Sequence, residues 1–320
     1  MVHPTFYGRL LLVGAVVAGL LFPAATRAGI PSGTEVTLPI QQVRETGYYT
    51  GAWTVERGWD QEAELEFAQW VETIGRAREK KVFRIARGLK DPKVNPLYTP
   101  EDKRLRLETD CATLPYAMRA YFAWKTRRPF SWNSNKGRRY ASNNHPERWS
   151  DFSQFKDPVR LIVRAMADVS SATFRMHAKL EGTDTYPIDP TRFSILPGVT
   201  YYDPNGHVLL VYRVDPETGN VHMMDSHPDG TLTLKVFGPK IKVGTARFGG
   251  GFRAWRHYRV ELLDEATGSF RIVRDTNAEF PWYSDTAQYR GKYPIGDRLL
   301  TFHDWIRWRV RWRDEGVAAK

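Results

Sequence analysis

The apolar residues in the first half of the chain recur at helical spacing. Asp60 is a good N-cap for a helix that runs to about Arg87, with acidic side chains in its first turns and basic ones in its last. The same spacing predicts helices over 110–125 and 159–170. We therefore expect the first half to be mainly helical.

From Ile195 onward the pattern becomes strand-like. A turn and a strand are expected over 196–202, and longer apolar strands over 207–214 and 221–225. The segment Asp215–Asn220 carries an early Pro and a late Gly, which is typical of a hairpin loop between those two strands. Helices first and antiparallel strands later predict an α+β fold. Further strands are expected over 231–237, 252–263 and 270–273.

The C-terminal segment allows two interpretations. Asp297 can cap a helix that runs through Arg313, whereas Ile306–Arg313 alternates strictly between apolar and basic residues, as a strand does. We favour the helix because of its cap and because Leu299 and Leu300 precede the alternating run. The Trp side chains of this helix can pack on the core while the Arg side chains face solvent. Alternatively, the Trp and Arg side chains together can contact an anionic surface.

The first 28 residues have the pattern of a secretory signal peptide. Arg9 precedes the apolar run Leu10–Leu21, and small residues follow that allow cleavage after Ala28 or after Ala25. The apolar run is too short for a comfortable membrane span. The mature protein is therefore expected to be secreted or periplasmic.

Composition and charge narrow the range of partners. The chain has 320 residues, 42% of them hydrophobic, which is enough for one large core or two small ones. The net charge is +11, and the leader contributes Arg9 and Arg27 without an acid, so the mature chain keeps 11 − 2 = +9. A basic exported protein suits acidic partners such as cell-wall polymers or lipid head groups. Nucleic acid is not an expected partner, because the compartment is wrong and no nucleic-acid motif is present.

Cys111 is the only cysteine in the sequence and stands at the expected start of a helix. Pro115 lacks an N–H and is tolerated only near a helix start, so the helix should open between Asp110 and Thr113. There the helix dipole favours thiolate over thiol. A lone cysteine can also be a small buried hydrophobe. An unpaired thiol kept in an oxidising compartment favours the catalytic interpretation.

His207 and Asp225 complete a candidate triad with Cys111. His207 begins one expected strand, and Asp225 ends the next. A thiolate can attack a carbonyl, an imidazole can transfer the proton, and a carboxylate can orient and stabilise the imidazolium. The three residue types therefore point to nucleophilic catalysis.

Three motifs resemble the papain-like cysteine hydrolase superfamily over roughly residues 110–228. They are Asp110-Cys111-Ala112 at a helix start, Leu196-Pro197-Gly198, and Gly206-His207-Val208-Leu209-Leu210-Val211. The most similar branches are the NlpC-type cell-wall peptidases and the transglutaminase-like proteins. The resemblance implies a papain-like core, with the cysteine at the N-terminus of a helix packed on an antiparallel sheet. It also implies hydrolysis or acyl transfer at a peptide or amide bond, cell-wall peptide being the substrate in the NlpC branch.

With this resemblance the chain divides into four expected parts. The signal peptide covers 1–28 and an N-terminal helical extension covers 29–100. The papain-like catalytic core covers 101–275, and a basic extension rich in Trp and Arg, packed on the core, covers 276–320.

The role of Asp225 depends on the register of the hairpin. If the loop consists of residues 216–219, the side chain of Asp225 points away from the face that carries His207. A register that pairs Val211 with Val221 instead places Asp225 directly beside His207. A slip of one residue flips every side chain of a strand to the other face. The reserve candidates for the third position or the base are Ser226, His222 and His227.

The oxyanion site is only half assigned by the sequence. Papain-type enzymes have a glutamine a few residues before the cysteine, where this chain reads Lys103–Arg106. The Cys111 backbone N–H is one expected donor, and the second stays open.

A metal site built from His207, His222, His227 and Asp225 is not expected, because no H-x-x-x-H or clustered cysteine pattern supports it. No cofactor is expected either. The alternative to an enzyme is an inactive secreted papain-like module that binds anionic envelope polymers or a membrane surface, and reactivity of the Cys111 thiol distinguishes the two.

Overall fold

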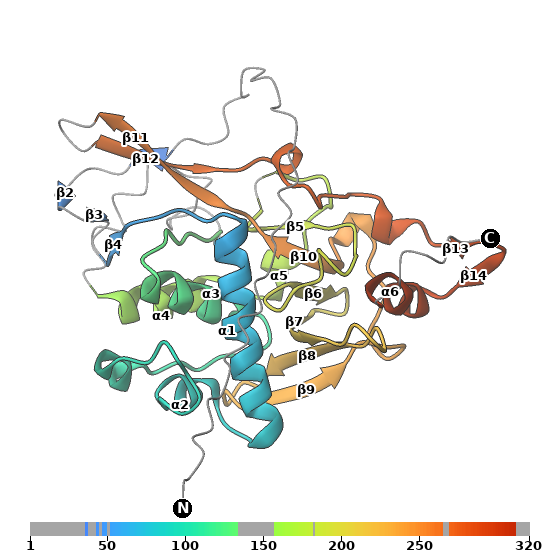
Figure 1. The fold of residues 1–320 in the computed structure, drawn as a ribbon, viewed down its shortest axis with the longest axis horizontal. Helices are drawn as coiled ribbons and strands as arrows, with labels where there is room; N and C mark the ends of the chain where they lie inside the picture. The colour runs from blue at the N-terminus through green and yellow to red at the C-terminus, as the bar shows by residue number, and fades with distance from the viewer. Residues whose placement is uncertain are drawn as a thin grey trace, which may run out of the picture. The chain divides into compact units, whose positions relative to one another are not determined.

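A computed structural model describes residues 36–37, 43–44, 47–49, 52–133, 157–181, 183–264 and 269–311 of the chain (Figure 1). The expected signal peptide lies outside the described residues. The helices are α1 Gln61–Lys80, α2 Ile85–Leu89, α3 Thr113–Lys125, α4 Pro158–Asp168, α5 Ser171–Phe174 and α6 Phe302–Val310. The strands are β1 Val36–Thr37, β2 Val43–Arg44, β3 Gly47–Tyr49, β4 Thr54–Val55, β5 Thr185–Pro187, β6 Thr200–Asp203, β7 His207–Val214, β8 Val221–Ser226, β9 Leu232–Val236, β10 Gly251–Trp255, β11 Tyr258–Asp264, β12 Ser269–Arg274, β13 Tyr293–Ile295 and β14 Arg298–Leu300.

The largest sheet among the described residues has six strands in the order β5-β10-β6-β7-β8-β9. Every neighbouring pair in it is antiparallel. Figure 1 shows α1, α3 and α4 to one side of this sheet and α6 on another side. The expected α+β class is thus confirmed at the level of mixed helices with an antiparallel sheet.

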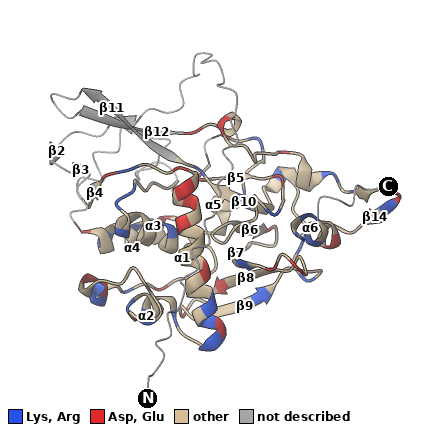
Figure 2. Ribbon diagram, viewed as in Figure 1, with Lys and Arg blue, Asp and Glu red and all other residues tan. Residues whose placement is uncertain are grey.

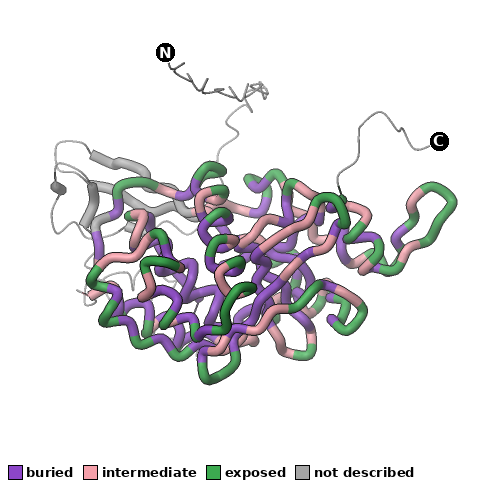
Figure 3. The backbone as a smooth tube through the Cα atoms, turned by 60° about the horizontal axis from the view of Figure 1, so that its bottom comes forward, coloured by how far each residue is buried: buried purple, intermediate pink, exposed green. Residues whose placement is uncertain are grey.

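The strand β7 alternates between two hydrophobic cores. Val208 and Leu210 belong to the core that includes residues of α1, α3 and α4, whereas Leu209 and Val211 belong to the core that includes residues of α6. All four side chains are at most 1% exposed. Because both faces of the strand are buried, it reads as a continuous apolar run. Figure 3 shows buried backbone in the interior of the described part of the chain and exposed backbone at its periphery.

The helix α1 packs against strand β7 of the sheet, and at Gly75 the helix has no side chain at this contact. Asp60 caps it, since its side chain accepts from the Ala63 N–H at 2.8 Å. A Cβ built at Gly75 would lie 2.2 Å from the ring of Tyr212 in β7. The glycine therefore lets helix and strand approach closely, and the Tyr212 hydroxyl donates to Glu79 one turn further on, at 2.9 Å. Figure 2 shows the acidic start and basic end expected for α1.

The first helix is shorter than expected, ending at Lys80 rather than near Arg87. Lys81 is extended, with φ −153° and ψ 137°. This extended segment brings Arg84 into an isolated bridge with Thr231, ahead of the short helix α2. The tertiary pairing overrides the helical spacing of the sequence.

The C-terminal helix starts later than expected. Asp297 lies between β13 and β14, after Gly296 with φ +54°, and so belongs to a tight hairpin. Thr301 is the actual cap, because its side chain accepts from the Asp304 N–H at 3.1 Å. Residues 302–310 are helical rather than strand-like because their apolar side chains cover the second core at helical spacing: Phe302, Trp305, Ile306 and Val310.

The strand expected over 252–263 is two strands in different sheets. β10 joins the six-stranded sheet, whereas β11 pairs with β12. Between them the Arg256 guanidinium is buried and donates to the Thr183 carbonyl at 2.5 Å. A buried charge needs such partners, which bend the chain out of the first sheet at this point.

Residues Gly33–Lys320 form one compact unit, and the boundaries expected at 100 and 275 stay predictions. Within the described residues, no helix is long and apolar enough to span a bilayer.

Gly75→Ala should destabilise the protein although alanine favours helices. The added methyl group overlaps the Tyr212 ring, and overpacking of this kind costs about 1–3 kcal/mol, against a gain of roughly 1 kcal/mol in helix propensity. Guanidinium unfolding followed by tryptophan fluorescence measures the difference, with Gln69→Ala at an exposed position of the same helix as the control. Equal stability of Gly75→Ala and wild type would show that the close contact does not matter.

Candidate active site

Cys111 lies in the turn that leads into α3. The Asp110 carboxylate accepts from the N–H groups of Ala112 at 3.0 Å and Thr113 at 2.8 Å, and the Asp110 carbonyl accepts from the Leu114 N–H. Asp110 thus caps the first turn in the way expected for a helix start. Cys111 is a free, half-buried cysteine at that start.

The segment before Cys111 is fixed to the end of β8. The hydroxyl groups of buried Thr109 and Ser226 are 2.7 Å apart, and the Ser226 hydroxyl also donates to the Thr109 carbonyl at 2.9 Å. Ser226, a reserve candidate for the site, thus has a different position: it holds the cysteine loop beside the strand that carries Asp225. No signal in the sequence pattern indicated this contact.

A β-bulge determines which face of the sheet Asp225 occupies. At the loop end the hairpin has the four-residue-loop register, with Val214 opposite Val221. The register then shifts between Val211 and Arg213, so that Leu210 lies opposite Met224. The bulge leaves Tyr212 as the extra residue of β7. Continued by one residue, this register sets Asp225 at the level of Leu209, on the face that Leu209 shares with His207.

The expectation that a four-residue loop turns Asp225 away from His207 is therefore wrong. It assumed a regular ladder, and one extra residue reverses the facing of every later position. The alternative register, with Val211 opposite Val221, is wrong as well, because Val211 pairs with Met223. The two candidate residues come together diagonally across the strands.

The structure brings the three predicted site residues together. His207 Nε2 lies 2.5 Å from Asp225 Oδ2, and the Cys111 side chain interacts with the same imidazole. The hydrogen bond to Asp225, and then the interaction with Cys111, raise the pKa of His207 to about 9 against the opposing effects of burial and of Lys235. Because pH 7 is below this pKa, the imidazole is then the cationic form, protonated at both ring nitrogens.

Asp225 is a buried carboxylate that stays ionised. Its side chain is 3% exposed, whereas that of His207 is 36% exposed. Burial by itself would raise the pKa of Asp225, but hydrogen bonds from His207, Lys235 and Thr233 hold it well below its usual range. The charge is available to orient and stabilise an imidazolium.

Sequence reasoning missed Thr233 and Lys235, which lie on β9. The Thr233 hydroxyl donates to Asp225 Oδ1, and Lys235 Nζ donates to Asp225 Oδ2 at 2.7 Å while lying 3.1 Å from His207 Nε2. The signal was present in the pattern, because Asp225 pairs with Thr233 across the ladder and Lys235 is two residues further along, on the same face.

The two reserve histidines lie elsewhere. His222 contacts Arg213 at 3.3 Å, and burial and that cation lower its pKa. His227 is exposed in the turn between β8 and β9, where its backbone N–H donates to the Thr231 carbonyl. Neither has a contact with Cys111 among the described residues.

The oxyanion donor expected at the Cys111 backbone N–H stays a prediction. Among the described residues, the backbone N–H of Cys111 donates to no acceptor within the protein. No group of three or more His, Cys, Asp or Glu side chains in this part of the chain is arranged to hold a metal ion.

Comparisons of the chain with protein-family models, with curated proteins and with solved structures find no match.

Asp225→Asn should lower the pKa of His207 from about 9 toward the ordinary value near 6.5, because it removes the largest cause of the rise. Lys235→Gln should move it the other way, because a neighbouring positive charge disfavours the imidazolium. A pH titration of the His207 ring by NMR measures both changes, with the exposed Lys240→Gln as control. A His207 pKa that is the same in Asp225→Asn as in the wild type would contradict the assigned contact.

Proposed function

We propose that the protein is a cysteine-dependent amide or peptide-bond hydrolase, or an acyl transferase, that uses Cys111, His207 and Asp225 as a papain-like triad. The single observation that carries the proposal is the position of His207 between the thiol and a buried, ionised carboxylate. The resemblance of the three motifs to papain-like enzymes adds weight to it.

The geometry gives each ring nitrogen of His207 one task. Nε2 lies against Asp225, so its proton points to that carboxylate, and Nδ1 is left for the thiol. In the proposed reaction Cys111 attacks as the thiolate, beside an imidazolium that holds a proton on Nδ1. This is the state in which a cysteine attacks a carbonyl.

The proposed reaction needs only these groups, the substrate and a water molecule or a second amine. The Cys111 sulfur bonds to the substrate carbonyl carbon, and the carbonyl oxygen takes up the negative charge beside the Cys111 N–H. The His207 imidazolium gives its Nδ1 proton to the leaving amine as the C–N bond breaks. Water or a second amine, deprotonated by the neutral imidazole, attacks the thioester carbon, the C–S bond breaks, and the Cys111 thiolate is released beside the His207 imidazolium. The same site can therefore serve hydrolysis or transfer.

The proposed substrate is a peptide bond of an acidic cell envelope. The signal-peptide pattern favours a location in the periplasm or outside the cell, and the resemblance to the NlpC branch favours peptide bonds of the cell wall as the substrate. A positive net charge suits an acidic envelope polymer as the surrounding matrix. The alternative, an inactive papain-like module that binds such polymers, predicts the same location without a reactive thiol.

His207→Ala should slow alkylation of Cys111 by iodoacetamide at pH 7 by about tenfold or more. Without the imidazolium partner, a thiol is only a few per cent ionised at this pH. Asp225→Asn should cause a smaller loss, because the thiol keeps its base but the base is less well oriented and less basic. Mass spectrometry after timed quenching measures the rate at this single cysteine.

The matched control is His227→Ala, which removes an exposed histidine outside the site and should leave the rate unchanged. A Cys111 that reacts only after unfolding would exclude the enzyme and favour the binding module. A rate lowered by His207→Ala but not by Asp225→Asn would reduce the triad to a Cys-His dyad.

A further inference from the structure

The Asp225 carboxylate has two oxygens, and different donors reach each of them. Oδ2 lies 2.5 Å from His207 Nε2 and accepts from Lys235 Nζ at 2.7 Å. Within the described part of the chain, Oδ1 accepts from the Thr233 hydroxyl alone. The proposed reaction involves Oδ2 through His207, so the contact at Oδ1 lies outside that reaction.

A carboxylate keeps one orientation only if both of its oxygens are held. The last torsion of an aspartate side chain is broad and roughly two-fold, unlike the staggered torsions nearer the backbone. At Asp225 the two partners of Oδ2 are the Lys235 ammonium on a long flexible stem and the His207 imidazole that has to be oriented. Neither of these partners fixes the plane of the carboxylate. A short, stiff side chain at Oδ1 does.

Thr233 stands directly opposite Asp225 in the β8–β9 ladder. Just beyond the ladder, the His227 N–H donates to the Thr231 carbonyl at 3.0 Å. Hydrogen-bonded pairs alternate with other pairs in an antiparallel ladder, so Asp225 and Thr233 form the next hydrogen-bonded pair. A β-branched side chain is also restricted at its first torsion. The Thr233 hydroxyl is therefore held in place by its own backbone.

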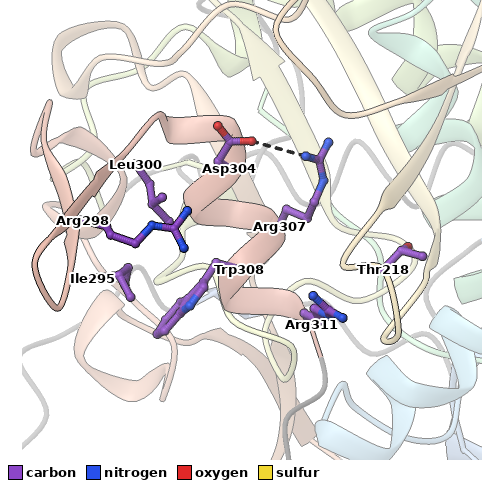
Figure 4. Close-up of a pocket in the computed structure, with 8 residues that line it drawn as sticks. All are labelled: Thr218, Ile295, Arg298, Leu300, Asp304, Arg307, Trp308 and Arg311. Atoms are coloured by element: carbon purple, nitrogen blue, oxygen red, sulfur yellow. Dashed lines mark hydrogen bonds and ion pairs between the residues drawn. The ribbon is translucent and has the colours of Figure 1, made fainter. Parts of the chain in front are cut away.

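Two other hydrogen bonds from threonine to aspartate are local and exposed. Thr218 donates to Asp215 at 2.7 Å, within the loop between β7 and β8, and Figure 4 shows Thr218 at the hollow beside α6. Thr231 donates to Asp229 at 2.8 Å, two residues before it. Contacts of this kind stabilise a turn within one segment. The contact of Thr233 differs from them, because it joins two strands and its acceptor side chain is only 3% exposed.

We propose that Thr233 is a positioning residue of the triad, whose hydroxyl holds the Asp225 carboxylate with Oδ2 toward His207. Its part in catalysis rests on the proposed function, whereas the orientation of the imidazole does not. With Oδ2 held in place, Nε2 of the ring stays against Asp225 and Nδ1 is left for Cys111. Thr233 acts through Asp225 and not on the substrate.

Loss of the hydroxyl frees the carboxylate to turn. The Lys235 side chain is 43% exposed and flexible, so its ammonium can follow either oxygen of Asp225. The His207 imidazole then loses its fixed acceptor for part of the time. Because a thiol and its base react fastest when they are already aligned, the thiol should become less reactive.

Thr233→Val removes the hydroxyl and keeps the branched shape that suits a strand. The His207 Nε2 proton, followed by proton NMR, should exchange with water about threefold faster or more, because its hydrogen bond to Asp225 is less persistent. Alkylation of Cys111 by iodoacetamide at pH 7 should slow by about threefold or more. Thr233→Ser keeps the hydroxyl and should restore most of both quantities.

The matched control is Thr218→Val, which removes an exposed threonine–aspartate hydrogen bond at the other end of the β7–β8 hairpin and should change neither quantity. Equal proton exchange in Thr233→Val and wild type would overturn the proposal. An equal loss in Thr233→Ser would overturn it too, because the hydroxyl would then not be the group that matters. If Cys111 is unreactive in the wild type, the proposed function fails. Faster proton exchange in Thr233→Val, restored by Thr233→Ser, would still establish that Thr233 orients His207.

Discussion

The arrangement of the proposed triad depends on one extra residue in one strand. Tyr212 is the bulged residue of β7, and its ring lies against α1 where Gly75 has no side chain, while its hydroxyl reaches Glu79. The side chain of the extra residue therefore packs against α1. The resulting shift of one position moves Asp225 to the face of His207. A helix–sheet contact in the core thus decides whether an acid and a base meet at the end of the sheet.

The neighbouring strand β9 brings a cation, Lys235, close to Asp225. Asp225 accepts from His207, Thr233 and Lys235, and Lys235 lies almost equally near the imidazole. The ammonium stabilises the carboxylate but opposes the imidazolium, so the two effects on His207 have opposite signs. The hydrogen bond to Asp225 and the interaction with Cys111 outweigh the opposition from Lys235, since the pKa of His207 still rises to about 9. An imidazolium limited in this way remains an acid strong enough to give its proton to a leaving amine.

The sequence predicted the parts of the fold that depend on local chemistry. The bounds of β7 and the four-residue loop after it follow from an apolar run and from turn residues, and the start of the cysteine helix follows from Asp110 and Pro115. The features it missed depend on contacts between distant segments. The bulged Tyr212 lies against Gly75, the segment after α1 forms a bridge between Arg84 and Thr231, and Ser226 contacts the loop of Cys111 through Thr109. Periodicity describes one element at a time, so it carries no information on such contacts.

The proposed triad needs an imidazole held by a buried acid, which a sheet end and a capped helix start provide. His207 and Asp225 lie on neighbouring strands, and the Ser226 hydroxyl holds the loop of Cys111 beside the end of β8. The three residues therefore meet through contacts between segments that are far apart in the sequence, and no single element determines the site.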